Sequence, residues 1–510
     1  MRSVAVIGGG HNGLVAAVRL AERGCRVTVL ERGAETGGCL WTERHASGAI
    51  VERGAFEHGG MRRVVTELGL DVEYREHPVL AGFLFGDGER RMFYSDLDRT
   101  VAGLGMDGPA YRRLAERASA LFGLLETFET PPTLTSVASA LAPLAGGDAL
   151  FRTMIGSAEA ALDDALVDRH TRAALVLQAA HAQVPAWAPG TGMLALMLPG
   201  DHGENGLRPA GGSGALTASL IRALESRGGR VRTGAEVVRL GSDAGGGGMI
   251  ALADGETLHA DAVISTIGIP RTAVALTDPA PRLRSVASSL HSGQFNVGEL
   301  TISLVYENGI DLGLEDRDAV HYLVADPADV HQSFAEVKAG RAPESPWAMM
   351  ASVEGGGVWL SSIVPLRTTS PWTPERERSA ARRVVDQACE VTGIDLRRGL
   401  VDMVVSGPAT WAGRIGGDGN PSHIDNTLDQ LLGWRAPGHA DGRSELPWLF
   451  LAGAGHHPGG GLSGASGMTA ADAVLDPRRR RDSVAHRAGR ELHGLLQGFA
   501  AYRTMRRGRP

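Results

Sequence analysis

Three glycines near the N-terminus have the spacing of a dinucleotide-binding turn. They follow the β-branched run Ser3–Ile7 and precede an apolar helical pattern over residues 14–20. Glycines with this spacing let the backbone turn tightly and approach a pyrophosphate, and the following helix N-terminus faces the phosphates. The candidate contacts in this turn are Gly8, Gly10, Asn12 and Gly13. The chemistry expected of the segment is dinucleotide binding.

An acidic residue ends the next predicted strand. Gly24 ends the helical pattern, Arg26–Leu30 is predicted as a strand, and Glu31 follows it directly. A carboxylate about 20 residues after the glycine turn accepts hydrogen bonds from an adenosine ribose. The neighbouring Arg32 offers an alternative, because an arginine there can accept the 2′-phosphate of NADP.

Length and composition exclude several classes of protein. The 510 residues exceed what one hydrophobic core usually holds, and 43% hydrophobic with 21% charged residues is typical of a globular chain. The three cysteines form no Cys-x-x-Cys pair and no cluster with histidine, so we expect no metal site. Lys338 is the only lysine and lies outside any motif, which argues against a P-loop and a lysine Schiff base.

The net charge of −7 is unevenly distributed. Residues 477–510 carry ten arginines against Asp482 and Glu491, so the rest of the chain is acidic and we expect no nucleic-acid partner. Apolar residues at helical spacing in this basic tail could contact a membrane surface or another subunit, or could dock on the parent chain. The N-terminus has no signal-peptide pattern, which predicts a cytoplasmic protein.

The residues after Glu31 carry a family resemblance. The segment Gly37-Gly38-Cys39-Leu-Trp-Thr42 resembles the Gly-Gly-Arg-x-x-Ser/Thr extension of the FAD-dependent amine-oxidase and phytoene-desaturase superfamily. Many members carry arginine where this chain has Cys39, so one phosphate contact is lost while both glycines remain. The resemblance implies FAD as the cofactor, with Gly37 and Gly38 close to it.

Two later segments resemble the same superfamily. Residues 206–240 look like its second FAD segment, in which the strand backbone at Val237 would bracket the adenine. Residues 447–467 resemble the closing motif of phytoene desaturase-like proteins, in which a helix opening near Ser463 directs backbone N–H groups at the flavin. The cofactor contacts that this motif implies are Gly453, Gly455, Ser463 and Gly464.

Two histidines in the closing motif are the candidate catalytic residues. His457, with His456 as second choice, lies on the glycine loop expected at the flavin. An imidazole with an ordinary pKa near ~6.5 suits proton exchange at neutral pH. The alternative is structural, since a histidine beside glycines can cap the turn through its ring nitrogens.

The expected fold is α/β, a Rossmann-type FAD-binding domain with an inserted mixed-sheet substrate domain and a helical cover. The predicted elements are a helix over 111–126, strands over 300–306, 347–353 and 358–364, and a helix over 374–391. The predicted boundaries are 1–75, 205–290 and 430–476 for the FAD domain, 76–204 for the cover, 291–429 for the substrate domain and 477–510 for the tail.

The resemblance implies an FAD-dependent oxidoreductase that transfers a hydride to or from a mostly apolar small organic substrate. Desaturation, saturation and flavin-assisted isomerisation all fit this description of the reaction. The tailoring of a natural product is one process in which such a reaction would serve. Two alternatives stay open: a flavin-bearing interaction protein without turnover, and an NADP-dependent oxidoreductase.

Overall fold

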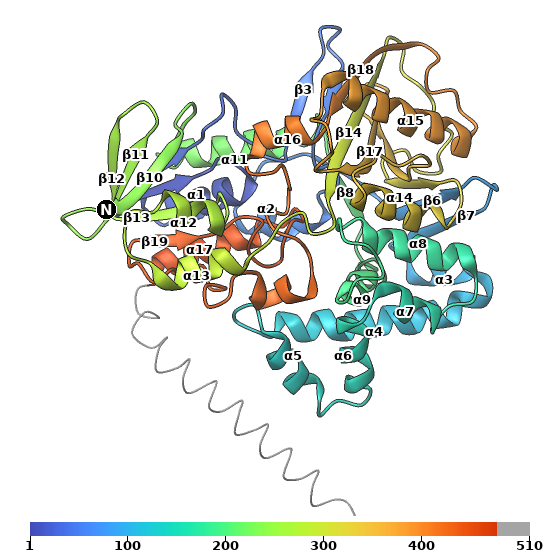
Figure 1. The fold of residues 1–510 in the computed structure, drawn as a ribbon, viewed down its shortest axis with the longest axis horizontal. Coiled ribbons are helices and arrows are strands. Elements are labelled where there is room, and N and C mark those ends of the chain that lie inside the picture. The colour runs from blue at the N-terminus through green and yellow to red at the C-terminus, as the bar shows by residue number, and fades with distance from the viewer. Residues whose placement is uncertain (477–510) are drawn as a thin grey trace, which may run out of the picture.

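The computed structural model describes residues 1–476, so the predicted basic tail, residues 477–510, lies outside the described residues. Figure 1 shows a nucleotide-binding domain on one side, with a large sheet and a group of helices on the other. This arrangement confirms the predicted α/β architecture with a mixed substrate-domain sheet. Among the described residues, none of the helices has the length and apolar character needed to cross a membrane.

A five-stranded parallel sheet is the centre of the nucleotide-binding domain. Its order is β19-β13-β1-β2-β9, all parallel. The strands are β1 (Ser3–Ile7), β2 (Arg26–Leu30), β9 (Arg230–Arg232), β13 (Ala262–Ser265) and β19 (Leu449–Leu451). The valines and isoleucines of β1 and β13 are buried, as a sheet covered on both faces requires. Since the strands share one direction, the turns after their C-terminal ends meet at one edge.

Five helices and a small antiparallel sheet cover the two faces. On one face, α1 (His11–Glu22), α11 (Gly214–Glu225) and α17 (Ala465–Leu475) bury their apolar sides in one core cluster. The other face is covered by β10 (Val237–Ser242), β11 (Gly248–Leu252), β12 (Thr257–Ala260), α12 (Ile269–Ala275) and α13 (Pro281–Ser289).

A seven-stranded mixed sheet forms the second domain, in the order β18-β14-β17-β16-β15-β6-β7. Its strands are β6 (Val79–Phe85), β7 (Arg90–Tyr94), β14 (Val297–Tyr306), β15 (His321–Val324), β16 (Ala348–Val353), β17 (Gly357–Pro365) and β18 (Leu400–Ser406). Strands β14, β16 and β17 confirm the three predicted strands. The predicted start of the helical cover at residue 76 is wrong, because β6 and β7 pair as a hairpin and extend the sheet through β15.

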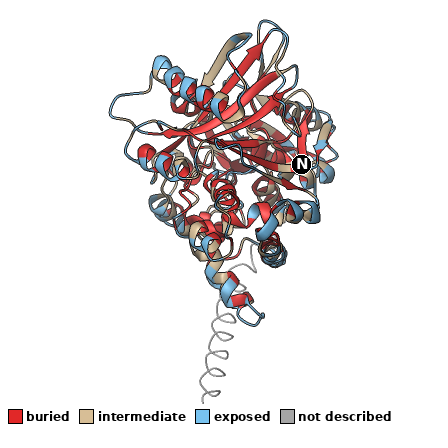
Figure 2. Cartoon of the chain, turned by 90° about the vertical axis from the view of Figure 1, so that its right-hand side faces the viewer, coloured by how far each residue is buried: buried red, intermediate tan, exposed pale blue. Residues whose placement is uncertain are grey.

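The two faces of this sheet meet different neighbours. Leu300, Ile302 and Leu304 of β14 pack against α15 (Pro374–Thr392), which agrees with the predicted helix over 374–391. The opposite face packs against the helical cover and α14 (Asp329–Lys338). Figure 2 shows the sheet strands as buried and the outer helix surfaces as exposed. Odd-numbered positions of β14, such as 297 and 299, therefore point away from α15.

The helical cover and the connections complete the described chain. The cover consists of α3 (Leu97–Gly103), α4 (Gly108–Glu126), α5 (Leu134–Leu141), α6 (Gly147–Ile155), α7 (Ala158–Asp163), α8 (Arg169–Ala180), α9 (Thr191–Ala195) and α10 (Met197–Gly200). Helix α4 confirms the predicted helix over 111–126. The connections are β3 (Thr42–Arg44), β4 (Ile50–Glu52), α2 (Arg62–Glu67), β5 (Tyr74–His77), β8 (Gly206–Pro209) and α16 (Pro408–Ile415).

Candidate functional site

The glycine turn joins β1 to α1 in the manner the sequence predicts. A Cβ on Gly13 would lie 2.1 Å from the carbonyl oxygen of Gly8, so no larger residue fits at this position. Gly10 differs, because the nearest atom to its Cβ position is the Cα of Gly38 at 4.0 Å. The first intrahelical bond runs from Leu14 N to Gly10 O, and the preceding amides of α1 are left to face a ligand. The turn is thus a cradle of backbone N–H groups with open space at Gly10.

Glu31 ends β2 and holds the turn in place. One carboxylate oxygen accepts a hydrogen bond from Gly9 N at 2.8 Å, and the other accepts one from Gly33 N at 2.7 Å. Each oxygen keeps a second lone pair. The carboxylate therefore orders the glycine loop and remains available to hydroxyl groups of a ligand.

The Gly37-Gly38 segment lies directly against the glycine turn. Gly37 N donates to Gly9 O at 2.9 Å, and Gly38 has a φ of +59°, a conformation that favours glycine. The guanidinium of Arg414, at the end of α16, donates from Nη2 to Thr36 O at 2.9 Å and from Nε to Gly38 O at 3.3 Å. The substrate domain thereby supplies an arginine to the loop in which Cys39 stands at the arginine position of the motif that the sequence resembles.

A cleft of about 410 Å³ opens at the C-terminal edge of the parallel sheet, a volume in the usual range for cofactor sites. It brings together residues from the three segments that the sequence singled out. The predicted contacts that line it are Gly8, Gly10, Asn12, Gly13, Glu31, Arg32, Gly38, Val237 and Gly453. The predicted contacts outside its lining are Gly37, Gly455, Ser463 and Gly464. The agreement covers the glycine turn, the acid after β2 and the strand at Val237.

Three arginines line the cleft. Arg32 donates to Gly413 O at 2.7 Å, Arg271 donates to Ile415 O at 2.9 Å, and Arg414 contacts the Gly38 loop. Burial lowers the pKa of Arg271, and the nearby charge of Arg32 lowers it further. A group of cations beside a helix N-terminus provides strong electrostatic complementarity to a pyrophosphate. The sequence analysis missed Arg271 and Arg414, although Arg271 lies six residues after the end of β13, at the correct edge of the sheet.

His423 is a further lining residue that the sequence analysis missed. It has a φ of +63°, which is unusual for a non-glycine residue, and its Nδ1 has no hydrogen-bond partner among the described residues. Burial lowers its pKa to about 3, with smaller contributions from Arg271 and Arg435. The ring is therefore neutral at pH 7 and forms part of the cleft wall next to Gly453.

The two candidate catalytic histidines lie outside the cleft lining. His456 is 4% exposed, and neither of its ring nitrogens has a hydrogen-bond partner within residues 1–476. Burial lowers the pKa of His456 to about 3 and that of His457 to about 4, so both rings are neutral at pH 7. The expectation of an ordinary pKa is therefore wrong, because the sequence does not reveal how deeply the closing loop packs beside Arg435. A catalytic role for either histidine stays a prediction.

Helix α17, which follows the closing motif, packs on α1 and does not line the cleft. Gly464 precedes α17 at a φ of +65°, with Val15 of α1 as its nearest neighbour. The hydroxyl of Ser466 donates to Asn12 Oδ1 at 2.9 Å and accepts from Gly453 N at 3.1 Å. Ser466, in the first turn of α17, thus links this helix to Asn12 and Gly453.

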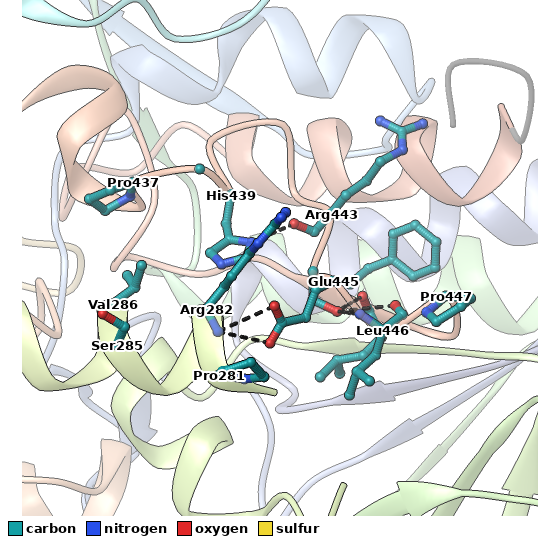
Figure 3. Close-up of a pocket in the computed structure, with 14 residues that line it drawn as sticks. Pro281, Arg282, Ser285, Val286, Pro437, His439, Arg443, Glu445, Leu446 and Pro447 are labelled. Carbon is teal, nitrogen blue, oxygen red and sulfur yellow. Dashed lines mark hydrogen bonds between the residues drawn. The ribbon is translucent and has the colours of Figure 1, made fainter. Parts of the chain in front are cut away.

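A second hollow in the described part of the chain is larger than the cleft but is a different feature. Figure 3 shows this groove of about 690 Å³ beside α13, where Arg282 N and the carboxylate of Glu445 are hydrogen-bonded at 3.1 Å. It includes Pro447 and Leu449, at the N-terminal end of β19, whereas the cleft includes Gly453, beyond the other end of that strand. The groove therefore lies at the edge of the sheet opposite the cleft. Residues 1–476 also contain no cluster of His, Cys, Asp and Glu arranged to hold a metal ion.

The fold and the cleft define a dinucleotide-binding α/β protein with a substrate domain over the C-terminal edge of its parallel sheet. Residues 13–475 match the family model described as flavin containing amine oxidoreductase. The chain belongs to this family and is a flavin-dependent oxidoreductase.

Curated relatives resemble the chain over most of its length, and solved structures share its fold. The chain is 25% identical to hydroxyneurosporene desaturase of Cereibacter sphaeroides, covering 92% of this chain and 97% of the relative. It is 24% identical to pyridine nucleotide-disulfide oxidoreductase domain-containing protein 2 of Mus musculus, covering 92% of each. Putrescine oxidase bound to putrescine has the same fold, with a TM-score of 0.58 and 16% identity over 93% of this chain and 99% of that chain. An oxidoreductase from Methanosarcina mazei gives a TM-score of 0.60 with 15% identity over 93% and 99%.

Proposed function

We propose that the cleft binds FAD and that the bound flavin exchanges a hydride with a carbon atom of a small, mostly apolar organic substrate. The observation that carries the proposal is the cleft itself, where a glycine cradle and a helix N-terminus meet three arginines. Gly10 leaves space where a side chain would otherwise stand, and the cations compensate the two charges of a pyrophosphate.

Each part of the cleft has a role in holding the cofactor. The α1 N-terminus and Arg414 would bind the pyrophosphate, Glu31 would accept hydrogen bonds from the ribose, and the Val237 backbone would lie along the adenine. Arg32 would lie near the adenosine but remain bonded to the carbonyl group of Gly413. When bound, the flavin supplies a site that accepts or donates two electrons as hydride.

The substrate proposal is supported by the surroundings and by the relatives. Aromatic and aliphatic side chains fill the space between the seven-stranded sheet and the helical cover. Besides the desaturase, a 118-residue segment is 34% identical to a limonene dehydrogenase component of Castellaniella defragrans, covering 22% of this chain and 21% of the relative. One relative is named a desaturase and the other a dehydrogenase, which favours removal of hydrogen from carbon over carbon–nitrogen chemistry here.

The test is the identity of the cofactor in the purified full-length chain. The protein should be yellow and should release FAD, not FMN, on denaturation, because the cleft extends past the pyrophosphate site to Glu31 and Val237. Anaerobic mixing with apolar candidates such as limonene or hydroxyneurosporene should then bleach the flavin. A colourless protein that added FAD does not restore would overturn the proposal.

A further inference from the structure

Arg435 is a buried cation that has no carboxylate among its hydrogen-bond partners in residues 1–476. It ends the short 3₁₀ turn Leu432–Arg435 and is 1% exposed. Its acceptors are main-chain carbonyl groups and the side-chain amide of Asn426. Burial lowers its pKa to about 10, so the guanidinium keeps its positive charge at pH 7. A buried charge that lacks an ion-pair partner destabilises a fold, which points to a role beyond packing.

The guanidinium joins two stretches of the cleft wall. Its Nε and Nη2 donate to Ala454 O at 3.2 Å and 2.9 Å, and Nη2 also donates to Ser422 O at 2.9 Å. Ala454 lines the cleft, and Ser422 stands between Pro421 and His423, which line it as well. The charge of Arg435 therefore lies directly behind the wall of the cleft.

This part of the wall is at the flavin end of the proposed cofactor site. Glu31, which would bind the adenosine ribose, follows β2 on one side of β1. The stretch Gly453–Ala454 follows β19, and β13 and β19 lie on the other side of β1. A dinucleotide that crosses the glycine turn with its ribose at Glu31 extends its other half toward β13 and β19. The flavin half would therefore lie on the side of the cleft that Arg435 supports.

The groups around Arg435 compensate its charge only in part. Asp425 supplies a negative charge that acts on Arg435. Its carboxylate, however, accepts hydrogen bonds from Gly293 N and Gln294 N at 2.8 Å each, and not from the guanidinium. The neighbouring histidines of the cleft wall and the closing motif are neutral at pH 7, because burial lowers their pKa. A positive charge thus remains behind the wall.

We propose that Arg435 sets the reduction potential of the bound flavin. Reduction by a hydride adds two electrons and one proton, so the uncharged flavin ring becomes an anion. A fixed positive charge stabilises that anion and therefore raises the potential. Arg435 is not part of the cleft lining, so it would act through its electric field and not by contact. The inference rests on the proposed function, because it requires the bound flavin.

The test is the midpoint reduction potential of the FAD-bound full-length protein, titrated in the presence of redox dyes, which needs no substrate. Arg435→Gln removes the charge and should lower the equilibrium constant for two-electron reduction by about tenfold or more, which corresponds to about 30 mV or more. Arg435→Lys keeps a positive charge but loses the planar fork of donors. Its potential should therefore stay closer to that of the parent than to that of Arg435→Gln.

The two variants separate the charge of Arg435 from its hydrogen bonds. A purely structural clamp depends on the planar fork, so both substitutions would then lower the Tm and weaken FAD binding while leaving equal potentials. Arg443→Gln is the matched control, because Arg443 also donates to two main-chain carbonyl groups, Ala473 O at 3.0 Å and Asp476 O at 2.9 Å. Arg443 lines the groove at the opposite edge of the sheet (Figure 3), so this variant should keep the parent potential.

Asp425→Asn tests the opposite sign. It removes the negative charge that acts on Arg435, so the potential should rise. Together with Arg435→Lys, it keeps the proposal falsifiable if Arg435→Gln does not retain FAD.

Three outcomes would overturn the proposal. These are an unchanged potential in flavin-loaded Arg435→Gln, a potential in Arg435→Lys as low as in the glutamine variant, and no rise in Asp425→Asn. A protein without flavin would fail the proposed function before this measurement begins, so the two failures are distinguishable.

Discussion

Arg414 and Gly38 are 376 residues apart in the chain and joined by a hydrogen bond of 3.3 Å from the guanidinium Nε to the carbonyl oxygen. This contact brings an arginine of the substrate domain to the loop that follows the glycine turn. The family resemblance places an arginine one residue further, at Cys39. The guanidinium that is missing from the sequence motif is thus present in the structure, contributed by a different element.

Arg414→Ala should weaken FAD binding. Loss of a charge-assisted contact to phosphate costs roughly 1.5–3 kcal/mol, which corresponds to a rise in Kd of roughly 10- to 100-fold. Fluorescence titration of the apoprotein with FAD measures this change. Arg378→Ala is the control, because Arg378 lies exposed on α15 and should leave Kd unchanged. Equal Kd values for both variants would remove Arg414 from the cofactor site.

Gly10 and Gly13 should respond differently to substitution. Gly10 has a φ of −74° and open space at its Cβ position, so Gly10→Val should fold with a nearly unchanged Tm as apoprotein and fail to retain FAD. A Cβ on Gly13 would lie 2.1 Å from Gly8 O, so Gly13→Ala should itself destabilise the fold by roughly 1–3 kcal/mol. Thermal melts of the apoproteins and FAD content measure both effects. FAD retained at the parent level by Gly10→Val would contradict the placement of the pyrophosphate.

NADPH should reduce the flavin slowly or not at all. Within residues 1–476 there is one parallel sheet with one glycine turn of this kind, and the proposed FAD site occupies it. Anaerobic stopped-flow absorbance with NADPH measures the rate, and dithionite provides the fully reduced reference. Bleaching by NADPH alone at ordinary turnover rates, above ~1 s⁻¹, would contradict this prediction.

The sequence predicted the features that local geometry decides. The turn at Gly8–Gly13 is determined by residues next to one another in the sequence. The position of Glu31 follows from the lengths of the helix and the strand that precede it. Arg271 and Arg414 were not predicted, because their positions depend on how distant elements dock. The pKa of His457 was predicted wrongly for the same reason, since burial is a property of the whole fold. The residues of strands β6 and β7 were assigned to the helical cover instead of the seven-stranded sheet, because the sequence of a strand does not identify the strand with which it pairs.

The stability of the chain should fall steeply as the pH drops below about 6.5, the ordinary pKa of histidine. Burial is the main cause that lowers the pKa of seven histidines to about 3 or 4: His11, His58, His181, His321, His423, His456 and His457. Their rings are neutral in the folded chain, whereas the unfolded chain binds protons below pH ~6.5. The stabilisation is therefore complete above that pH and is lost progressively toward pH ~4.

The variant His456→Gln measures the contribution of one of these histidines to the pH dependence of stability. Neither ring nitrogen of His456 has a partner in the described part of the chain, so glutamine sacrifices no hydrogen bond seen there. The free energy of unfolding, measured by urea titration at pH 7, 6, 5 and 4, should depend on pH less steeply in the variant, by up to about 1.4 kcal/mol per pH unit. The comparison with the parent is essential, because buried acids such as Asp201, whose pKa is raised to about 7, titrate with the opposite sign. His259→Gln is the control, since the His259 ring is already exposed to solvent in the folded chain. Parallel pH profiles for His456→Gln and the parent would show that His456 is protonated in the folded chain, and that the closing loop is more open than its packing indicates.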